Sequence, residues 1–278
     1  MTILLFSVLL IAFSVLAGML GALTGLGGGI VVIPVLVLLF HIDIHYAMGA
    51  SLISVITTSS GTAAAYLYNG YINLRIGMFL EVAAVIGAFV GALLIAVVSK
   101  TFLTIVFSIV LFFSAYLTIK RHEEAEQYHD SHPLAVALKL DGTYPTLHGT
   151  DHYHVQNAPL GFLLMGCAGC LSGLLGIGSG ILKVLAMDQA LRIPYKVATT
   201  TSNFMIGITA AVSAGIYFTH GYIIPSVAFP VMLGVVVGSF IGAKLLSSIG
   251  TRTLRVIFSI AISLVGLQML INALRGTL

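Results

Sequence analysis

The chain has 278 residues, of which 59% are hydrophobic and only 8% are charged, and its formal net charge is +3. Soluble domains carry about 25% charged residues, so this composition excludes an ordinary soluble fold and indicates a polytopic, all-α membrane protein. The few basic residues lie in short loops rather than on one face, and we therefore expect no nucleic-acid partner.

The first half of the chain contains five apolar segments, which we predict to be helices. They cover residues 3–24, 29–40, 46–68, 74–98 and 102–119. The first segment has no basic region before it, so we interpret it as a retained helix rather than a signal peptide. The second segment would be about 18 Å long as an α-helix, roughly half of the hydrocarbon core. It follows a helix break in the glycine-rich stretch "GALTGLGGGIVVIP", Gly21 to Pro34.

A polar connector over residues 120–158 follows the first half. The pieces "ALKLDGTYPTL" and "HYHVQ" alternate apolar and polar residues, which predicts a small β-hairpin. Imidazole is a common metal ligand, but the connector has no cysteine and no firm ligand spacing. We expect solvated histidines and no metal site, with a metal at "DHYHV" as the weaker alternative. The connector histidines are His122, His129, His132, His148, His152 and His154.

The second half repeats the first at a constant offset of 151 residues. "GLGGGI" (25–30) matches "GIGSGI" (176–181), "YLYNGYI" (66–72) matches "YFTHGYI" (217–223), and "GAFVGALL" (87–94) matches "GSFIGAKL" (238–245) without a gap. Chance is a poor explanation for matches over such a distance. We therefore divide the chain into a first transmembrane repeat (1–119), the connector (120–158) and a second transmembrane repeat (159–278).

The distribution of positive charges predicts how the repeats are oriented. Five crossings per repeat would invert the second repeat and place eight basic residues on one side against two on the other, whereas four crossings give five on each side. Basic residues favour the cytoplasmic side of a membrane. We predict inverted repeats of five segments in the cell membrane, with both termini extracytoplasmic and the connector cytoplasmic.

The repeated signature resembles that of a known family. The motifs "GLGGG" and "GIGSG", the stretch "GIGSGILKVLAMDQALRIPYKVATTTSNFMIGITA" (176–210) and the turns "NGYI" and "HGYI" are similar to the TauE/SafE family of sulfite exporters. The resemblance covers both hydrophobic halves. It implies a transporter, most often an exporter, of sulfite, organosulfonates or related sulfur-containing anions.

The two glycine clusters are candidates for an anion-binding site. A broken helix presents the partial positive charge of its N-terminus, and glycine allows backbone N–H groups to approach an oxyanion closely. Tight helix packing by small residues is the alternative. The candidate residues are Gly27, Gly28 and Gly29 in the first repeat and Gly178, Ser179 and Gly180 in the second.

Two charged residues inside apolar segments are further candidates. Lys183 lies three residues after Gly180, where a cation opposes the helix dipole and is costly in a membrane. It either supplies positive charge to the substrate site, or pairs with Glu81 or reaches a water-filled vestibule. Burial disfavours the charged form of a carboxyl, so Glu81 is a candidate proton-coupling group or a structural partner for a lysine. For Asp188, a local pair with Arg192 is the favoured interpretation.

Hydroxyl-rich runs occupy the same helix of both repeats, in "SLISVITTSSGT" (51–62) and "ATTTSN" (198–203). Such groups either bond the preceding turn of their own helix or line a polar path. We predict that Ser51 and Ser202, with Asn203, face the substrate, followed by Thr58 and Thr209. For Cys167 and Cys170, in "CAGC", helix packing is favoured over a redox role.

The sequence thus predicts secondary transport of a small sulfur-containing anion by alternating access, coupled to protons or to the membrane potential. An anion channel, or a permease for a small solute without sulfur, is the alternative. An enzyme would need clustered acids, histidines or metal ligands at membrane depth, and neither glycine run ends in the GK[ST] of a P-loop. We expect no cofactor, and a homo-oligomer is compatible with the sequence.

Overall fold

The computed structural model describes residues 3–24, 28–67, 72–119, 131–146, 149–245 and 251–275. In the first half, the elements are α1 (Ile3–Thr24), α2 (Gly29–Pro34), the π-helical segment η1 (Val35–Leu39), α3 (Ile44–Leu67), α4 (Leu74–Leu94) and α5 (Lys100–Ile119). In the second half, they are α7 (Ala158–Leu175), α8 (Gly180–Leu185), the π-helical segment η2 (Ala186–Ala190), α9 (Tyr195–Thr219), α10 (Pro225–Leu245) and α11 (Thr251–Arg275).

The structure confirms an all-α polytopic membrane protein. Within the described residues, five helices are long and apolar enough to span a membrane, namely α4, α5, α7, α9 and α10. Many of their large apolar side chains face outward, for example Ile86 and Phe89 on α4 and Phe240 on α10. Exposed apolar surface of this extent is expected where lipid, rather than water, surrounds the protein.

The secondary structure repeats with the same offset as the sequence. The elements α2, η1, α3, α4 and α5 each begin 151 residues before α8, η2, α9, α10 and α11, and α1 ends 151 residues before α7. The short second helix after a glycine-rich break is therefore present in both halves, as predicted. In each half a π-helical segment of five residues continues this short helix.

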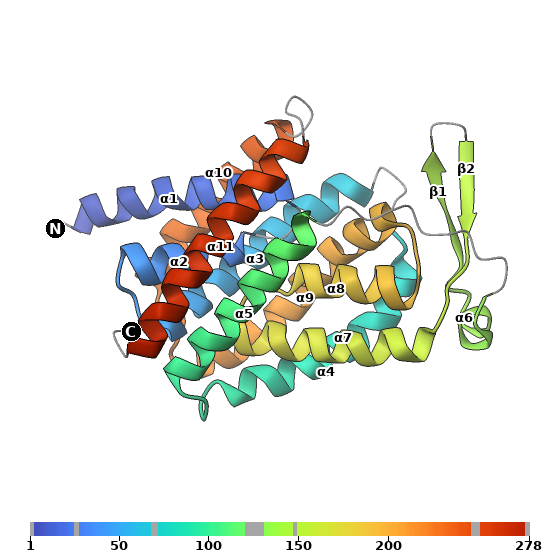
Figure 1. The fold of residues 1–278 in the computed structure, drawn as a ribbon, viewed down its shortest axis with the longest axis horizontal. Coiled ribbons are helices and arrows are strands. Elements are labelled where there is room, and N and C mark those ends of the chain that lie inside the picture. Colours follow the sequence, from blue (N-terminus) through green and yellow to red (C-terminus); the bar gives the residue numbers. More distant parts are fainter. Residues whose placement is uncertain are drawn as a thin grey trace.

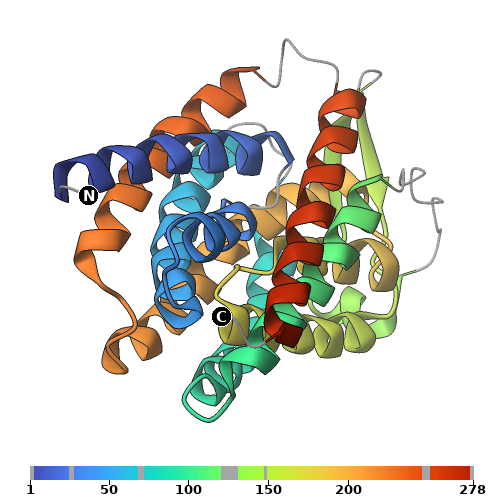
Figure 2. The same ribbon diagram turned by 60° about the vertical axis from the view of Figure 1, so that its left-hand side comes forward.

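The two halves are intertwined rather than placed side by side. Helix α1 packs along α10, and α7 packs along α4 (Figure 2). A Cβ atom at Gly87 would lie 2.0 Å from the carbonyl oxygen of Gly166, and one at Gly238 would lie 2.0 Å from that of Val15. These two contacts are equivalent under the repeat. The first helix of each half thus packs on the fourth helix of the other half.

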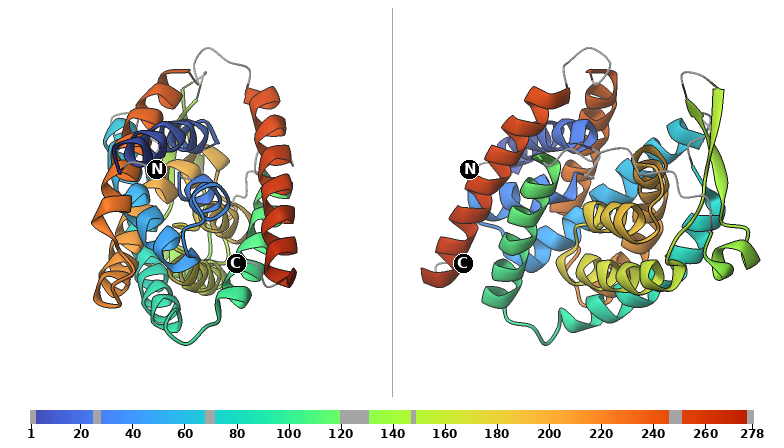
Figure 3. Two further views of the ribbon diagram at one scale, coloured as in Figure 1. Left: turned by 90° about the vertical axis from the view of Figure 1, so that its left-hand side faces the viewer. Right: turned by 45° about the vertical axis from the view of Figure 1, so that its right-hand side comes forward.

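Equivalent helices of the two halves run in opposite directions. On α3 and α9, Met48 lies at Tyr217 and Ser59 lies at Gly207, so the two helices are antiparallel. Helices α5 and α11 are likewise antiparallel along one side of the molecule (Figure 3). An antiparallel arrangement of equivalent helices requires an odd number of crossings in each half, which agrees with inverted repeats of five segments.

The two chain ends and the connector lie at opposite ends of the molecule (Figure 1). The connector contains α6 (Pro133–Ala137) and the antiparallel strands β1 (Gly142–Thr146) and β2 (Gly149–Tyr153), which form the predicted hairpin. Asn73 joins this unit to α4, because its Oδ1 accepts from the backbone N–H groups of Arg75 and Ile76, and its Nδ2 donates to Tyr153 Oη at 2.6 Å. The hairpin is therefore fixed to the first turn of a membrane helix.

Two of the connector histidines make hydrogen bonds within the connector while remaining partly exposed. His154 Nδ1 lies 2.9 Å from Ser131 Oγ, and His132 Nδ1 accepts the backbone N–H of Leu134 at the start of α6. His152 is exposed, as predicted. In the described part of the chain, no group of three or more metal-ligating side chains is close enough to hold a metal ion. His122, His129 and His148 lie outside the described residues.

Candidate functional site

A buried polar triad lies between α4, α8 and α9. Lys183 is 0% exposed, and its Nζ donates to Thr209 Oγ1 and lies 3.7 Å from Glu81 Oε2. Thr209 Oγ1 in turn donates to Glu81 Oε1 at 2.6 Å. One element comes from the first half and two from the second. The triad therefore joins the two halves through a buried ion pair.

The local structure explains how these side chains meet. Glu81 and Thr209 lie near the middle of α4 and α9, which run parallel to each other, since Gly77 contacts Thr201 a turn or two earlier on each helix. Lys183 lies one turn beyond Gly180, the first residue of α8. The break before α8 thus allows a short helix to begin at the depth where α4 and α9 carry their polar groups.

The ion pair is incompletely satisfied. Glu81 Oε2 is buried, and no hydrogen-bond partner reaches it among the described residues. Removing charge from water is costly unless each charged atom is paired and hydrogen-bonded. The carboxyl of Glu81 consequently retains one oxygen that could accept a proton or a further donor.

The second glycine break has a strained backbone and lies against α3. Gly176, Gly178 and Ser179 have φ angles of 65°, 72° and 47°. Glycine adopts this left-handed region readily, whereas serine does so at a cost. Ser51 Oγ donates to the carbonyl of Gly176 at 2.8 Å. The hydroxyl of Ser179 is buried and has no partner in the described part of the chain.

The two breaks meet at one side chain of α3. A Cβ atom at Gly29 would lie 2.8 Å from Val55 Cγ2 and 2.6 Å from Ser51 Oγ, and one at Gly178 would lie 2.8 Å from Val55 Cγ1. The breaks therefore approach Val55 from both sides, and any side chain at Gly29 or Gly178 would displace it. The two glycine clusters therefore lie close together at these positions.

The other predicted site residues have different surroundings. Gly28 lies against Gly18 of α1 and Val235 of α10, where it serves close packing. Ser202 Oγ donates to the carbonyl of Gly180 at 3.2 Å, so Ser51 and Ser202 both bond carbonyls of the second break. Thr58 donates to carbonyls of its own helix at Ser54 and Val55. Asn203 is buried. Gly27 lies outside the described residues.

Two features near the site were missed by the sequence analysis. The hydroxyl of the fully buried Tyr217 donates to the carbonyl of Leu174 at 2.9 Å, directly before the second break. The sequence does contain a signal for both residues, because Tyr217 and Tyr222 belong to the repeated motif "YFTHGYI" (217–223). The ring of Tyr222 stacks between His45 and His220, at centroid distances of 4.9 Å and 6.0 Å.

An ion-pair cluster lies in the loop that precedes α3. Asp43 pairs with Lys100 and accepts hydrogen bonds from the backbone N–H and the ring Nδ1 of His45 at 3.0 Å and 2.9 Å. Partial burial by itself would raise the pKa of the Asp43 carboxyl, but the hydrogen bonds from Lys100 and His45 outweigh it and lower that pKa below its usual value.

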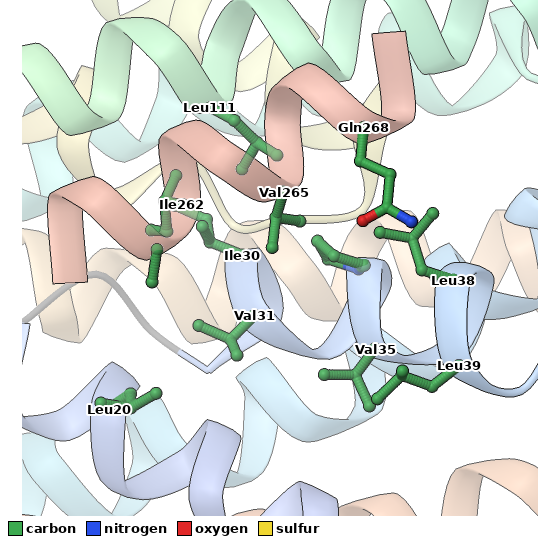
Figure 4. Close-up of a pocket in the computed structure, with 12 residues that line it drawn as sticks. Leu20, Ile30, Val31, Val35, Leu38, Leu39, Leu111, Ile262, Val265 and Gln268 are labelled. Atoms are coloured by element: carbon green, nitrogen blue, oxygen red, sulfur yellow. The ribbon is translucent and has the colours of Figure 1, made fainter. Parts of the chain in front are cut away.

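A cavity elsewhere in the bundle differs in chemistry from the polar triad. The pocket between α2, η1 and α11 has a volume of about 230 Å³. Gln268 is the one polar side chain among the twelve residues that line it, and aliphatic side chains such as Val31 and Val265 form its walls (Figure 4). Since it offers no charge to an anion, we do not assign this pocket to a polar substrate.

The remaining candidates are Cys167, Cys170 and Asp188. Cys167 is exposed and Cys170 is partly buried, and both thiols are free. The backbone of Cys170 contacts Gly87 and Gly91 of α4, which agrees with the packing interpretation. Asp188 accepts a hydrogen bond from the side chain of Gln189 at 2.7 Å.

Comparison with known proteins agrees with this architecture. The model of the family described as "Sulfite exporter TauE/SafE" matches residues 10–269. The chain is 26% identical to the probable membrane transporter protein YunE of Bacillus subtilis, covering 95% of this chain and 97% of that protein. It is 30% identical to the probable membrane transporter protein YdhB of the same organism, covering 85% and 89%.

A similar archaeal protein is the probable membrane transporter protein MJ0441 of Methanocaldococcus jannaschii, which is 27% identical over 95% of both chains. No solved structure shows significant similarity to the chain. The family model spans nearly all of both halves, and the similar proteins are named as transporters rather than enzymes. The chain therefore belongs to the TauE/SafE family and is a multi-pass membrane transporter.

Proposed function

We propose that the chain transports a small sulfur-containing anion, such as sulfite or an organosulfonate, and acts as an exporter. The observation that carries the proposal is Lys183, a cation completely removed from solvent in the middle of the bundle. A charge in this environment is costly and marks a substrate or ion pathway in many membrane proteins. Membership of a sulfite-exporter family supports the choice of a sulfur-containing anion.

The architecture supports alternating access as the mechanism. Two inverted halves that share one central site can exchange roles, so that the site opens first to one side of the membrane and then to the other. In this proposal, Lys183 and Thr209 bind the anion, and the breaks around Gly29 and Gly178 are the elements that move. Glu81 is the proton-coupling group.

The remaining polar groups complete the proposed site. Ser51 and Ser202 donate to two carbonyls of the second break, those of Gly176 and Gly180, and Asn203 lies next to Ser202 on the same helix. We place both termini outside the cell and the connector in the cytoplasm, on the basis of the uneven distribution of Lys and Arg residues.

The test is ligand-induced stabilisation of the purified protein. Sulfite, thiosulfate, sulfate, sulfoacetate and carboxylate anions would be added in turn and the thermal unfolding midpoint measured. A ligand at 100 times its Kd stabilises the folded state by about 2.7 kcal/mol, so a selective ligand is detectable. Lys183→Met should abolish the shift, whereas Lys196→Met, at an exposed lysine at the start of α9, should retain it. Stabilisation by apolar or cationic compounds alone would refute the proposal.

An anion channel, or a permease for a solute without sulfur, remains the second candidate. A carrier that alternates between two states saturates with substrate and accelerates labelled-sulfite uptake when unlabelled sulfite is present inside the vesicle. A channel shows neither behaviour. Counterflow in proteoliposomes therefore distinguishes the two, and selective stabilisation by carboxylates would favour the permease for another solute.

A further inference from the structure

We propose that the site carries one monovalent anion together with one proton, because the anion and the Glu81 carboxylate compete for the same ammonium group of Lys183. The inference rests on the proposed function and specifies its substrate class and coupling. It follows from the number of charges in the triad and from their isolation in the bundle.

Lys183 offers a single positive charge, and Glu81 is its acidic neighbour. The Lys183 Nζ to Glu81 Oε2 distance is 3.7 Å, and Thr209 bridges the two groups. An ammonium group has three donors, so the competition between Glu81 and a bound anion for Lys183 is one of charge rather than of donor number. Both acceptors are negative, and holding them together would leave one charge uncompensated in a site that is shielded from water.

Other titratable groups on the surrounding elements are engaged elsewhere or lie at a distance along the helices. Asp188 on η2 accepts from Gln189, and the hydroxyl of Tyr217 on α9 donates to Leu174. On α7, the backbone of Cys170 contacts Gly87 and Gly91, six and ten residues beyond Glu81 on α4, and Cys167 is exposed. On the helix ends, Arg75 of α4 and Tyr195 and Lys196 of α9 are exposed. The charge of the site is therefore decided by Lys183, Glu81 and the ligand.

Two states of this site are neutral. In the empty state, Lys183 is positive and Glu81 is ionised. In the loaded state, Lys183 is positive, Glu81 is protonated and the anion is monovalent. The two intermediate states, with only the proton or only the anion, carry a net charge of one. Burying an uncompensated charge costs several kcal/mol, so the neutral states are the ones that can close and reorient.

The same count of charges in the site predicts that the substrate is monovalent. A divalent anion bound to Lys183 would leave one negative charge even with Glu81 protonated. A monovalent oxyanion, such as a sulfonate or hydrogen sulfite, leaves none. Since both reorienting states are neutral, the cycle moves no net charge, and the direction of transport follows from the anion and proton gradients together.

The positions related to the triad by the repeat add no second proton-binding group. Under the 151-residue offset, the positions that match Lys183 and Glu81 are Val32 and Met232. Neither side chain can bind an anion or a proton. The predicted stoichiometry is therefore one proton for each anion.

The experiment uses the full chain in proteoliposomes, with labelled methanesulfonate as the monovalent probe and labelled sulfate as the divalent one. Anion uptake and proton movement are recorded together, and the membrane potential is clamped with potassium and valinomycin. We expect one proton per methanesulfonate, the same flux at zero and at inside-negative potential, and far slower sulfate flux. These measurements on the wild-type protein need no variant.

Variants then test whether Glu81 is the residue that couples proton movement to anion movement. Raising the pH should weaken methanesulfonate binding to the wild-type protein by up to about tenfold per unit once Glu81 is ionised, because the carboxylate then competes. Glu81→Gln should bind at all pH values with unchanged affinity. Its loaded site is neutral but its empty site carries a net charge of one, so it should exchange methanesulfonate across the membrane without protons and lose net uptake. Asp188→Asn, at a buried acid outside the triad, should keep the pH dependence of the wild type.

The outcomes separate this inference from the proposed function. Potential-driven methanesulfonate flux without protons, sulfate flux equal to that of methanesulfonate, or pH-dependent binding in Glu81→Gln would each overturn the inference and leave anion transport standing. Flux of sulfite without any flux of methanesulfonate would also overturn it. If none of the three anions is bound or moved by the wild-type protein, the proposed function itself fails.

Discussion

The two halves of the chain share their backbone and differ in their chemistry. Both have a short helix after a glycine break, continued by a π-helical segment at matching residues. In the second half this short helix carries Lys183, whereas the first half has Val32 at the same position. Thr209 bonds Lys183 and Glu81, whereas its counterpart Thr58 bonds carbonyls of its own helix. The inverted repeat thus supplies a symmetrical frame, and three residues make one central site asymmetric.

The largest expected effect comes from replacing Lys183 and Glu81 by the residues found at the matching positions of the other half. Lys183→Val alone leaves Glu81 as a buried unpaired acid, which should lower the free energy of unfolding by about 3–5 kcal/mol. Lys183→Val combined with Glu81→Met reproduces the Val32 and Met232 pair. Because replacing a buried ion pair by apolar residues is often neutral or stabilising, the double variant should unfold within about 1 kcal/mol of the wild type.

Thermal unfolding in detergent and sulfite flux in proteoliposomes check this prediction together. The double variant should be stable and inactive. If it is as unstable as the single variant, the pair contributes to folding beyond its charge, and if it transports sulfite, the asymmetric triad is not the site.

The second prediction examines the symmetrical frame. Gly87→Ala and Gly238→Ala each place a methyl group 2.0 Å from a carbonyl oxygen of the helix packed on it. Overpacking of this kind costs about 1–3 kcal/mol, and the two variants should lose similar stability. Gly215→Ala on α9 is the control, because nothing lies within 4 Å of the added Cβ and alanine favours a helix by about 1 kcal/mol. A large difference between Gly87→Ala and Gly238→Ala would show that the two crossed pairs are not equivalent.

The smallest expected effect concerns another one-sided ion pair. Asp43 contacts Lys100, whereas the matching positions of the second half are Pro194 and Thr251. The pKa of Asp43 is lowered in the folded protein from its usual value of 3.8, so its contribution to stability is present above that value and is lost as the pH falls through the folded pKa. Partial exposure limits this contribution to less than about 1 kcal/mol.

Unfolding midpoints measured from pH 6 down to about pH 3 test this prediction. The wild type should lose slightly more stability below about pH 4 than Asp43→Asn, and high salt should reduce the difference. Identical acid profiles for the two proteins would show that the pair does not contribute.

Much of the frame could be predicted from the sequence because it depends on local and repeated patterns. The 151-residue offset, the short helix after each break and the connector hairpin all follow from apolar runs, glycines and alternation. Glu81 could be named as one alternative partner of Lys183, and the structure shows this pair. Spacing along the chain does not reveal that Thr209 of α9 bridges the two side chains. The sequence also does not separate the surroundings of neighbouring glycines: Gly28 lies against α1 and α10, whereas Gly29 lies against Ser51 and Val55 of α3.

The crossed pairing of α1 with α10 has a consequence for how the protein is made. Gly18 and its contact Val235 are 217 residues apart. Since the N-terminus is synthesised first, the face of α1 that packs on α10 is exposed to lipid until nearly the whole chain has been inserted. Contacts at such a separation form late and slowly. Neither half can complete its own packing alone, so the folded transporter can only assemble from both halves at once.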